Sequence, residues 1–339
     1  MKENKVSTAL IGFGKVAQAY SKDPLTAKYY PYATHAQVLK AHPNIKWDMV
    51  VDPNHEAQKQ ARENWGINYV SSVIDFPDKT ISEIEMVVLT TPPSERIDLV
   101  SKFPNLKAVL VEKPLGLDFN SSSRFVDYCN QRNLIVQVNL WRRADHLFRE
   151  LANGMLEDLI GVPQSVFGFF GNGLINNGIH LIDFARMLFG EVKSVQRIQA
   201  FSSYSESPIK KDLNFGFSLE MSTGVVVFFS PLSFEHYREN GFSIWGTSGK
   251  LDILNEGLSV LYYPKGQNRA ISNEMEINYD KPVSIESTVG HAFYNIYDNL
   301  LASLLDKEKL FSCSQSALVT SQVLDTLQKA PLNGEVLNL

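Results

Sequence analysis

Two side chains that can move or hold a proton lie in short, distinctive segments. Lys113 is part of VEKPLG at residues 111–116, and His180 is part of NNGIHLID at residues 176–183. An imidazole titrates near neutral pH and can accept or return a proton, whereas an ammonium group stabilises negative charge on a nearby oxygen. The pair therefore predicts proton transfer at an alcohol or carbonyl oxygen. Each has a plain alternative: Lys113 as a surface lysine at a strand end, and His180 as a helix-start histidine bonded to the backbone.

The residues around His180 set the strength of the expected base. In a helix, Asn176 precedes His180 by four residues and Asp183 follows it by three, so the three side chains share a face. Asp183 is a candidate to orient the imidazole, with an acid on a solvated helix face as the alternative. Asn176 can bind a substrate hydroxyl, but it cannot ionise and so cannot stabilise an imidazolium by charge.

A glycine-rich segment, GFGKVA at residues 12–17, follows a strand-like run and begins a helix-like one. In this context Gly12 permits a tight turn, Gly14 lets the backbone approach a pyrophosphate, and Ala17 allows close packing of helix on strand. The helix N-terminus supplies N–H donors to the phosphates. The segment therefore predicts a dinucleotide site, contacted by Gly12, Phe13, Gly14, Lys15, Val16 and Ala17.

Asp52 ends the next strand-like run and can accept hydrogen bonds from an adenosine ribose, unless it is a solvated turn residue before Pro53. It lies 35 residues after Ala17, whereas the usual separation is about 20. An insertion at Ser21–Thr34 accounts for the excess. Because no arginine follows Asp52 closely to bind a 2′-phosphate, NAD is the expected cofactor, with NADP as the alternative.

The segment Thr90-Thr91-Pro92-Pro93 ends a later strand-like run. Ligands of open α/β sheets bind at the carboxyl ends of the strands, so Thr90, Thr91 and Pro92 are expected on the nicotinamide ribose side of the site. A strand exit punctuated by prolines is the alternative explanation.

Residues 1–140 alternate short β-rich runs with helical patterns, which is typical of a parallel Rossmann sheet covered on both faces. The strands are expected at Val6–Gly12, Ile45–Val51, Tyr69–Ser71, Met86–Thr90, Ala108–Val111 and Leu134–Leu140, with helices at Glu56–Asn64, Ser94–Lys102 and Asn120–Asn133. Six such strands make a complete dinucleotide-binding domain.

Residues 141–339 have a different pattern, with helices expected near His146–Leu159, His180–Phe189, His291–Leu305 and Ser314–Lys329. Strands are expected at Gln164–Phe170, Val195–Phe201, Phe215–Met221, Val225–Phe229, Phe242–Trp245 and Lys250–Leu254. Turn-sized links between successive strands favour antiparallel pairing. The whole chain is therefore expected to be an α/β protein, in which a C-terminal α/β domain with an open, largely antiparallel sheet follows the Rossmann domain.

Composition excludes several classes of protein. The 339 residues suit two domains, and a net charge of −5 without a basic stripe argues against nucleic acid. No apolar run is long enough for a membrane span and no secretion signal is recognised, so we expect a soluble cytoplasmic protein. The 2 cysteines and 7 histidines show no spacing typical of a disulfide scaffold or a metal site.

Taken together, these motifs resemble the glucose–fructose oxidoreductase / inositol dehydrogenase (Gfo/Idh/MocA) family. The matching pieces are residues 12–17, Asp52, 91–93, 112–114, 176–183 and the segment IWGTSGKL at 244–251, in the family's order. The resemblance implies cofactor contacts from Glu112 and Lys113, and substrate contacts from Lys113, Arg142, Arg143, Asn176 and His180; for the two arginines, solvated side chains are the alternative. It also implies a homodimer or homotetramer formed through the C-terminal sheet. The chain departs from the family at Asn176, where most relatives have aspartate, and at Arg96, where histidine is frequent.

The function implied is hydride transfer between NAD(P) and a secondary alcohol or ketone of a sugar, sugar derivative or polyol. Lys113, His180, Asn176 and Asp183 are the expected catalytic residues. Two alternatives stay open: a cofactor-binding sensor or regulatory protein with reduced catalysis, suggested by Asn176, and a glycosidase that uses NAD for transient oxidation. The small-molecule substrate itself is not specified by the sequence.

Overall fold

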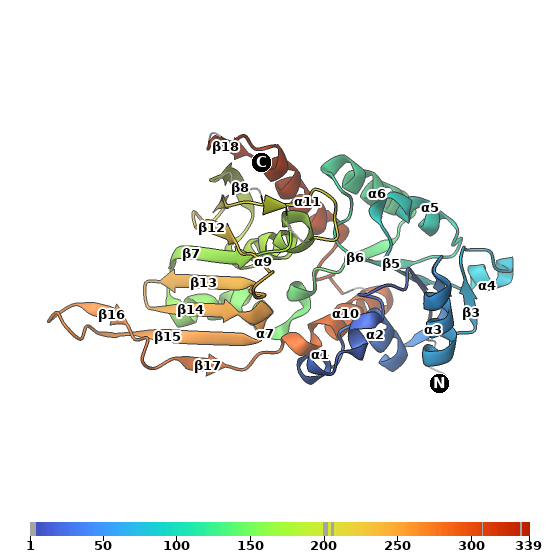
Figure 1. The fold of residues 1–339 in the computed structure, drawn as a ribbon, viewed down its shortest axis with the longest axis horizontal. Coiled ribbons are helices and arrows are strands. Elements are labelled where there is room, and N and C mark those ends of the chain that lie inside the picture. Colours follow the sequence, from blue (N-terminus) through green and yellow to red (C-terminus); the bar gives the residue numbers. More distant parts are fainter. Residues whose placement is uncertain (1–4, 199–202, 205–206, 307, 333) are drawn as a thin grey trace. The chain divides into compact units, whose positions relative to one another are not determined.

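The computed structural model describes residues 5–198, 203–204, 207–306, 308–332 and 334–339. The chain divides into two compact units. Figure 1 shows the fold, with colours that follow the residue numbers. Unit 1 holds residues 1–144 and 290–318, and unit 2 holds residues 145–289 and 319–339. The division expected from the sequence was 1–140 and 141–339, so residues 290–318 return to the first unit.

Unit 1 is built on a parallel sheet of six strands in the order β3-β2-β1-β4-β5-β6. The strands are β1 (Val6–Ile11), β2 (Ile45–Val51), β3 (Tyr69–Ser71), β4 (Met86–Leu89), β5 (Ala108–Val111) and β6 (Ile135–Val138). Every residue of β1, β4 and β5 is buried, because helices cover both faces of a parallel sheet. The predicted Rossmann sheet is confirmed.

The helices of unit 1 include one from the far end of the chain. They are α1 (Pro24–Tyr29), α2 (His35–Ala41), α3 (His55–Trp65), α4 (Asp78–Ser82), α5 (Arg96–Ser101), α6 (Phe119–Gln131) and α10 (Ala292–Asp306), with single 3-10 turns at Ala19–Lys22, Pro93–Glu95, Trp141–Ala144 and Val289–His291. In α10, Ile296, Tyr297 and Leu300 are buried in the same hydrophobic core as strand residues Leu10 and Leu110. Figure 1 shows α10 beside α2.

The first crossover helix is interrupted in a definite way. Gly14 and Lys15 accept backbone hydrogen bonds from Gln18 and Ala19, as in any α-helix. The next two carbonyls, of residues 16 and 17, accept instead from residues 35 and 36 at 3.3 and 2.9 Å. The helix therefore passes from Ala19 to α2 with residues 20–34 looped out, one residue more than the predicted insertion. Without these 15 residues, the 35-residue separation of Ala17 and Asp52 becomes 20, which is about the usual value.

Unit 2 contains a mixed sheet in the order β16-β15-β14-β13-β7-β12-β11-β8-β18, with β17 also paired to β15. Its strands are β7 (Pro163–Phe170), β8 (Val192–Arg197), β11 (Phe217–Met221), β12 (Val226–Pro231), β13 (Gly241–Gly246), β14 (Gly249–Leu254), β15 (Ser259–Gln267), β16 (Met275–Ile277), β17 (Val283–Ile285) and β18 (Val336–Asn338); β9 (Ser203–Tyr204) and β10 (Leu213–Asn214) form a separate pair. Only the β7–β12 pair is parallel among the described strands of the sheet. The open, largely antiparallel sheet is thus confirmed, although positions 199–201 of the strand expected at 195–201 lie outside the described residues.

The helices of unit 2 are α7 (His146–Glu150), α8 (Leu156–Ile160), α9 (Ile179–Phe189) and the part of α11 (Ser314–Lys329) after Leu318, with π-helical turns at Leu151–Met155 and Leu174–Gly178. The single helix expected near 146–159 is broken because Gly154 has φ of 121°. Helix α9 is packed on the sheet through Phe184, whose ring centre lies 5.5 Å from that of Phe242. Among the described residues, no helix is both long and apolar enough to cross a membrane.

Candidate active site

The glycine-rich loop follows β1 and is shaped by Thr90 at the end of β4. Gly12 has φ of +89°, and a Cβ at this position would lie 2.5 Å from Thr90 Oγ1. The Thr90 hydroxyl donates to the Gly12 carbonyl at 3.0 Å. Only glycine fits here. A Cβ on Gly14, in contrast, would meet no described atom within 4 Å, so this part of the loop is open to a ligand.

The remaining residues of the loop contribute mainly backbone. Phe13 is buried, and its ring centre lies 6.1 Å from that of Trp47 in the core. Lys15 is exposed, and the carbonyls of Val16 and Ala17 hold the start of α2. The loop therefore presents backbone groups and the Lys15 side chain to its open side.

Asp52 is fixed against this loop at the carboxyl end of β2. Its carboxylate accepts the Phe13 N–H at 2.6 Å and the Asn54 N–H at 2.8 Å. The side chain is half-buried. Because each carboxylate oxygen can accept more than one hydrogen bond, Asp52 can still bind a ribose hydroxyl, as the sequence predicts.

Arg96, at the start of α5, ties together the segments that follow β4 and β5. Its guanidinium donates to the Thr91 carbonyl at 3.0 Å, to the Pro114 carbonyl at 2.6 Å and to the Leu115 carbonyl at 3.2 Å. Burial lowers the pKa of Arg96 to about 10, against the opposing effect of the Glu112 charge. The group therefore stays charged at neutral pH, and it is a support that sequence reasoning noted only as a departure from the family.

Beside this tie, the Thr91 hydroxyl is buried and has no hydrogen-bond partner in the part of the chain that the structure describes. Pro92, the next residue, is exposed. A buried polar atom without a partner costs free energy unless a ligand or water satisfies it. The open face of Gly14 and this hydroxyl both fit a dinucleotide at the carboxyl edge of the sheet.

Lys113 lies two residues after the end of β5 and is half-buried, before a cis peptide bond to Pro114. Its neighbour Glu112 faces inwards, where the carboxylate accepts from His35 Nε2 at 3.0 Å and from the Asn139 amide. Burial raises the pKa of the Glu112 carboxyl, but the hydrogen bond and charge of His35, the charge of Lys113 and the Asn139 bond together hold it below its usual value. Lys113 thus has a fixed negative charge behind it.

The two arginines after β6 differ in exposure. Arg142 is buried, and its guanidinium lies 4.2 Å from the ring centre of Trp141. Arg143 is half-buried. Substrate contact by either side chain stays a prediction.

In unit 2, Asn176 lies in the π-helical turn before α9, and His180 lies in the first turn of α9 itself. Both are half-buried, whereas Ile175 and Ile179 are buried. The Asn176 amide donates to the Asn172 carbonyl at 3.2 Å. Single π-helical turns occur often at functional sites, and this one presents the two polar side chains beside a hydrophobic core.

Asp183 is buried and takes part in contacts between α9 and α11. Its carboxylate accepts from the Thr320 hydroxyl at 3.0 Å, and Arg186 lies 3.4 Å away. Arg186 also pairs with Glu191 at 2.7 Å. These contacts hold α9 to α11, and orientation of the imidazole by Asp183 stays a prediction.

Asp212 is a support that the sequence did not reveal. Its buried carboxylate accepts the N–H groups of Ile175 at 2.9 Å and Asn176 at 3.0 Å, and the Ser207 hydroxyl at 2.8 Å. A Cβ on Gly173 would lie only 1.8 Å from this carboxylate. Asp212 therefore caps the turn that carries Asn176, and no spacing in the sequence distinguishes it from other acids in a polar loop.

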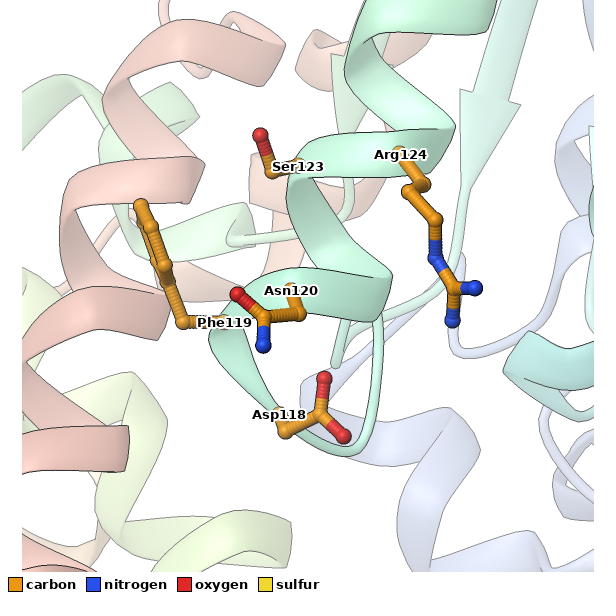
Figure 2. Close-up of a pocket in the computed structure, with 5 residues that line it drawn as sticks. All are labelled: Asp118, Phe119, Asn120, Ser123 and Arg124. Carbon is orange, nitrogen blue, oxygen red and sulfur yellow. The ribbon is translucent and has the colours of Figure 1, made fainter.

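A separate surface pocket of about 530 Å³ lies at the start of α6. Figure 2 shows its lining residues, Asp118, Phe119, Asn120, Ser123 and Arg124, none of which was predicted as a site residue. The Asp118 side chain itself caps the helix at the Ser121 N–H, 2.6 Å away. Among the described residues, no group of three or more His, Cys, Asp or Glu side chains could hold a metal ion.

Family models match both units. Residues 6–140 match the model described as an oxidoreductase family with an NAD-binding Rossmann fold, and residues 166–252 match the C-terminal domain of the same family. The chain belongs to the Gfo/Idh/MocA family. Its N-terminal unit is therefore an NAD-binding Rossmann fold, which agrees with the glycine loop, Asp52 and the unpartnered Thr91 hydroxyl.

One curated relative matches part of the chain. The scyllo-inositol 2-dehydrogenase (NAD(+)) of Bacillus subtilis is 26% identical over 211 residues, which are 57% of this chain and 57% of that protein. The chain thus matches little more than half the length of this curated relative.

Solved structures of similar fold cover nearly the whole chain. An oxidoreductase from Agrobacterium radiobacter, in complex with NAD+, L-tartaric acid and magnesium, has a TM-score of 0.72 at 16% identity and covers 98% of both chains. A super-repressor mutant of Gal80p from Saccharomyces cerevisiae has a TM-score of 0.73 at 13% identity and covers 98% of both chains. At these identities the likeness shows the fold alone.

Proposed function

We propose that this member of the Gfo/Idh/MocA family is an NAD-dependent oxidoreductase that acts on a secondary alcohol or ketone of a sugar, sugar derivative or polyol. The observation that carries the proposal is the setting of Lys113. It is half-buried at the carboxyl end of a strand in an NAD-binding sheet, with the carboxylate of Glu112 fixed behind it. The similarity to an inositol dehydrogenase supports the class of substrate.

In this proposal, Lys113 and His180 act at the reacting oxygen. NAD, when bound, supplies the hydride acceptor for alcohol oxidation. Lys113 donates a hydrogen bond to the oxygen and stabilises the negative charge that develops on it. His180 takes the hydroxyl proton, or returns it in the reverse direction. Asn176 binds a neighbouring hydroxyl through its amide.

Asp52 supports NAD over NADP in the same proposal. Its carboxylate is held at the loop by two backbone N–H groups, which supports a role as an acceptor for ribose hydroxyls. A 2′-phosphate would place another negatively charged group beside this carboxylate, and the two groups would repel each other. We expect NADH to bind at least 10-fold more tightly than NADPH, about 1.4 kcal/mol, and Asp52→Ala to reduce this preference.

The experiment is a titration of NADH fluorescence, followed by turnover assays with a panel of inositols, aldoses, sugar acids and nucleotide sugars. Lys113→Ala should bind NADH with nearly unchanged affinity and lose at least about 100-fold in kcat/KM. The proposal fails if the protein binds neither NADH nor NADPH, or if Lys113→Ala turns over an identified substrate at the wild-type rate.

Asn176, which cannot ionise, favours one further candidate, a cofactor-binding sensor with reduced catalysis. Stoichiometric NADH binding without hydride transfer to any member of the panel would support the sensor, and efficient turnover would exclude it. Release of an aglycone without net NADH formation would identify a glycosidase instead.

Assembly and location complete the proposal. Phe167 and Phe228 expose about two fifths of their surface on one face of the unit 2 sheet, and their rings stack with centres 5.6 Å apart. We propose a homodimer or homotetramer formed through this face, in the cytoplasm. Light scattering of the wild type and of Phe167→Asp tests the assembly, because a charge on this face should dissociate it.

A further inference from the structure

A buried chain of polar groups runs behind Lys113 in unit 1. His35, the first residue of α2, and Tyr297, from α10, are both fully buried. The Tyr297 hydroxyl lies 2.6 Å from His35 Nδ1, and His35 Nε2 lies 3.0 Å from Glu112 Oε1. These groups come from segments far apart in the sequence, and the function proposed above assigns no role to His35 or Tyr297.

The chemistry of the groups fixes the direction of the hydrogen bonds. A carboxylate only accepts, so Nε2 of His35 carries a hydrogen and donates to Glu112. The other ring nitrogen, Nδ1, shares a hydrogen bond with the Tyr297 hydroxyl. Burial, and next the charge of Glu112, raise the pKa of Tyr297 well above its usual value, so the hydroxyl keeps its proton. This series of hydrogen-bonded groups thus ends in the charged carboxylate of Glu112, beside Lys113.

We infer that His35 is a positioning residue for Lys113, because it keeps Glu112 in its charged form beside the lysine. The charge has a cost, since Glu112 is 8% exposed and a buried carboxyl favours its protonated form. His35 supplies the first of the effects that outweigh this cost, and Lys113 and Asn139 supply the others. Arg96 also interacts electrostatically with Glu112, whose charge raises the pKa of the arginine.

The interrupted helix explains how His35 reaches this position. Its backbone N–H bonds to the Val16 carbonyl, and the Thr34 hydroxyl accepts from the Gln37 N–H, so α2 begins at the histidine. The ring of Phe293 packs edge-on against the imidazole at 4.8 Å. His35 is therefore held by backbone register and by packing, and not only by its polar partners.

The consequence concerns the ammonium group of Lys113. If His35 is replaced by an apolar ring, burial is less strongly opposed and the pKa of the Glu112 carboxyl rises. Wherever that carboxyl is protonated, Lys113 loses its neighbouring negative charge and its ammonium form gives up a proton more easily. The catalytic effect of this loss rests on the function proposed above, but the state of the lysine can be measured without any substrate.

The test is competitive labelling of the full-length protein with acetic anhydride over a range of pH, with the Lys113 peptide quantified by mass spectrometry. In His35→Phe the labelling curve of Lys113 should move at least about one pH unit lower than in the wild type. Glu112→Gln should move it as far. His35→Gln, whose amide can still donate to Glu112, should leave the curve close to that of the wild type. With an identified substrate, the alkaline limb of the kcat profile should move in the same direction as the labelling curve.

His42→Gln is the matched control. His42 is also a buried histidine at the end of α2 and bonds to a carboxylate, that of Asp298 at 2.8 Å. Its loss should lower stability without moving the Lys113 curve. The inference is overturned if the curves of folded His35→Phe and wild type coincide, or if His42→Gln moves the curve equally. If His35→Phe does not fold, an unchanged curve in Glu112→Gln overturns it. A wild-type protein that turns over no substrate would refute the proposed function and leave this result intact.

Discussion

Lys113 and Asn176 both lie next to a buried carboxylate, but the two carboxylates come from different places. The one beside Lys113 belongs to its own neighbour, Glu112, and is held by His35 77 residues away. The one beside Asn176 belongs to Asp212, 36 residues away, and reaches the backbone N–H rather than a side chain. In the first region a distant group controls the charge of a local acid, whereas in the second a distant acid fixes the local backbone.

The difference teaches what each region can tolerate. Around Lys113, the fold maintains a charge, so changes there should alter ionisation. Around Asn176, the fold maintains the path of the chain, so changes there should alter geometry first. Substitutions at the supporting residues can therefore separate a change in ionisation from a change in geometry. The substitution expected to have the largest effect lies in the second region, around Asn176.

Asp212→Ala should have the largest effect. It leaves the N–H groups of Ile175 and Asn176 without their acceptor in a buried turn, and we expect a loss of about 3 kcal/mol in the free energy of unfolding. We expect kcat to fall about 10-fold or more, with the Kd for NADH unchanged. Urea unfolding and steady-state kinetics measure both. Asp212→Asn keeps an acceptor for only one of the two N–H groups, so its loss should lie between those of the wild type and Asp212→Ala. A wild-type kcat in Asp212→Ala would contradict the expectation.

Arg96→Lys should follow. Lysine keeps the charge, but it lacks the planar fork that reaches the carbonyls of Thr91, Pro114 and Leu115 together. We expect a loss of about 2 kcal/mol in stability and weaker NADH binding, because the Thr91 and Lys113 segments are no longer held together. Thermal unfolding and fluorescence titration test this. Unchanged NADH affinity would mean that the hydrogen bonds of Arg96 contribute to stability alone.

Glu112→Gln tests the charge in the first region through stability in acid. The pKa of Glu112 is lowered in the folded state, so its contribution is present above the unfolded value of about 4.3 and is lost as pH falls through the folded value. The wild type should therefore lose stability as the pH falls below about 4.3. The part of this loss that comes from protonation of Glu112, on the order of 1 kcal/mol, should be absent in the variant. Denaturant unfolding between about pH 3 and pH 7 spans this window, and parallel curves for the two proteins would contradict the expectation.

Asn176→Asp should have a smaller effect. It removes the amide bond to the Asn172 carbonyl and adds a negative charge close to Asp212, so stability should fall by about 1 kcal/mol. A carboxylate four residues from His180 favours the imidazolium. The acid limb of the kcat/KM profile should therefore move to higher pH by about half a pH unit. An unmoved limb would place the carboxylate away from the base.

The contrast between the two regions also explains what the sequence could predict. The six strands of unit 1, the glycine loop and α9 follow from hydrophobic runs and local motifs, whose information lies within a few residues. Lys113, Asp52 and Asn176 were predicted as site residues in the same way, and their roles stay predictions. The supporting residues His35 and Asp212 could not be predicted in this way. Their hydrogen bonds, with Glu112 and with the Asn176 N–H, depend on tertiary packing.

The interrupted helix is an intermediate case. The excess spacing between Ala17 and Asp52 predicted an insertion, and its end at Thr34 was correct. Sequence could not show that the helix resumes in register, because this depends on the bonds from residues 35 and 36 to the carbonyls of residues 16 and 17. For the same reason the return of α10 to the Rossmann core was missed: its amphipathic pattern does not say which core it covers.

Deletion of residues 20–34, with Ala19 joined to His35, should have the smallest effect on the site. The carbonyls of residues 14–17 already receive the hydrogen bonds of one continuous helix, so the join preserves their register. The variant loses the packing of Tyr32 on Tyr294, with ring centres 4.7 Å apart, and should unfold a few degrees lower. Because His35 keeps its place, both the NADH affinity and the Lys113 labelling curve should match the wild type. A labelling curve displaced as in His35→Phe would mean that the insertion, and not helix register, positions the histidine, and the charge beside Lys113 would then depend on a loop.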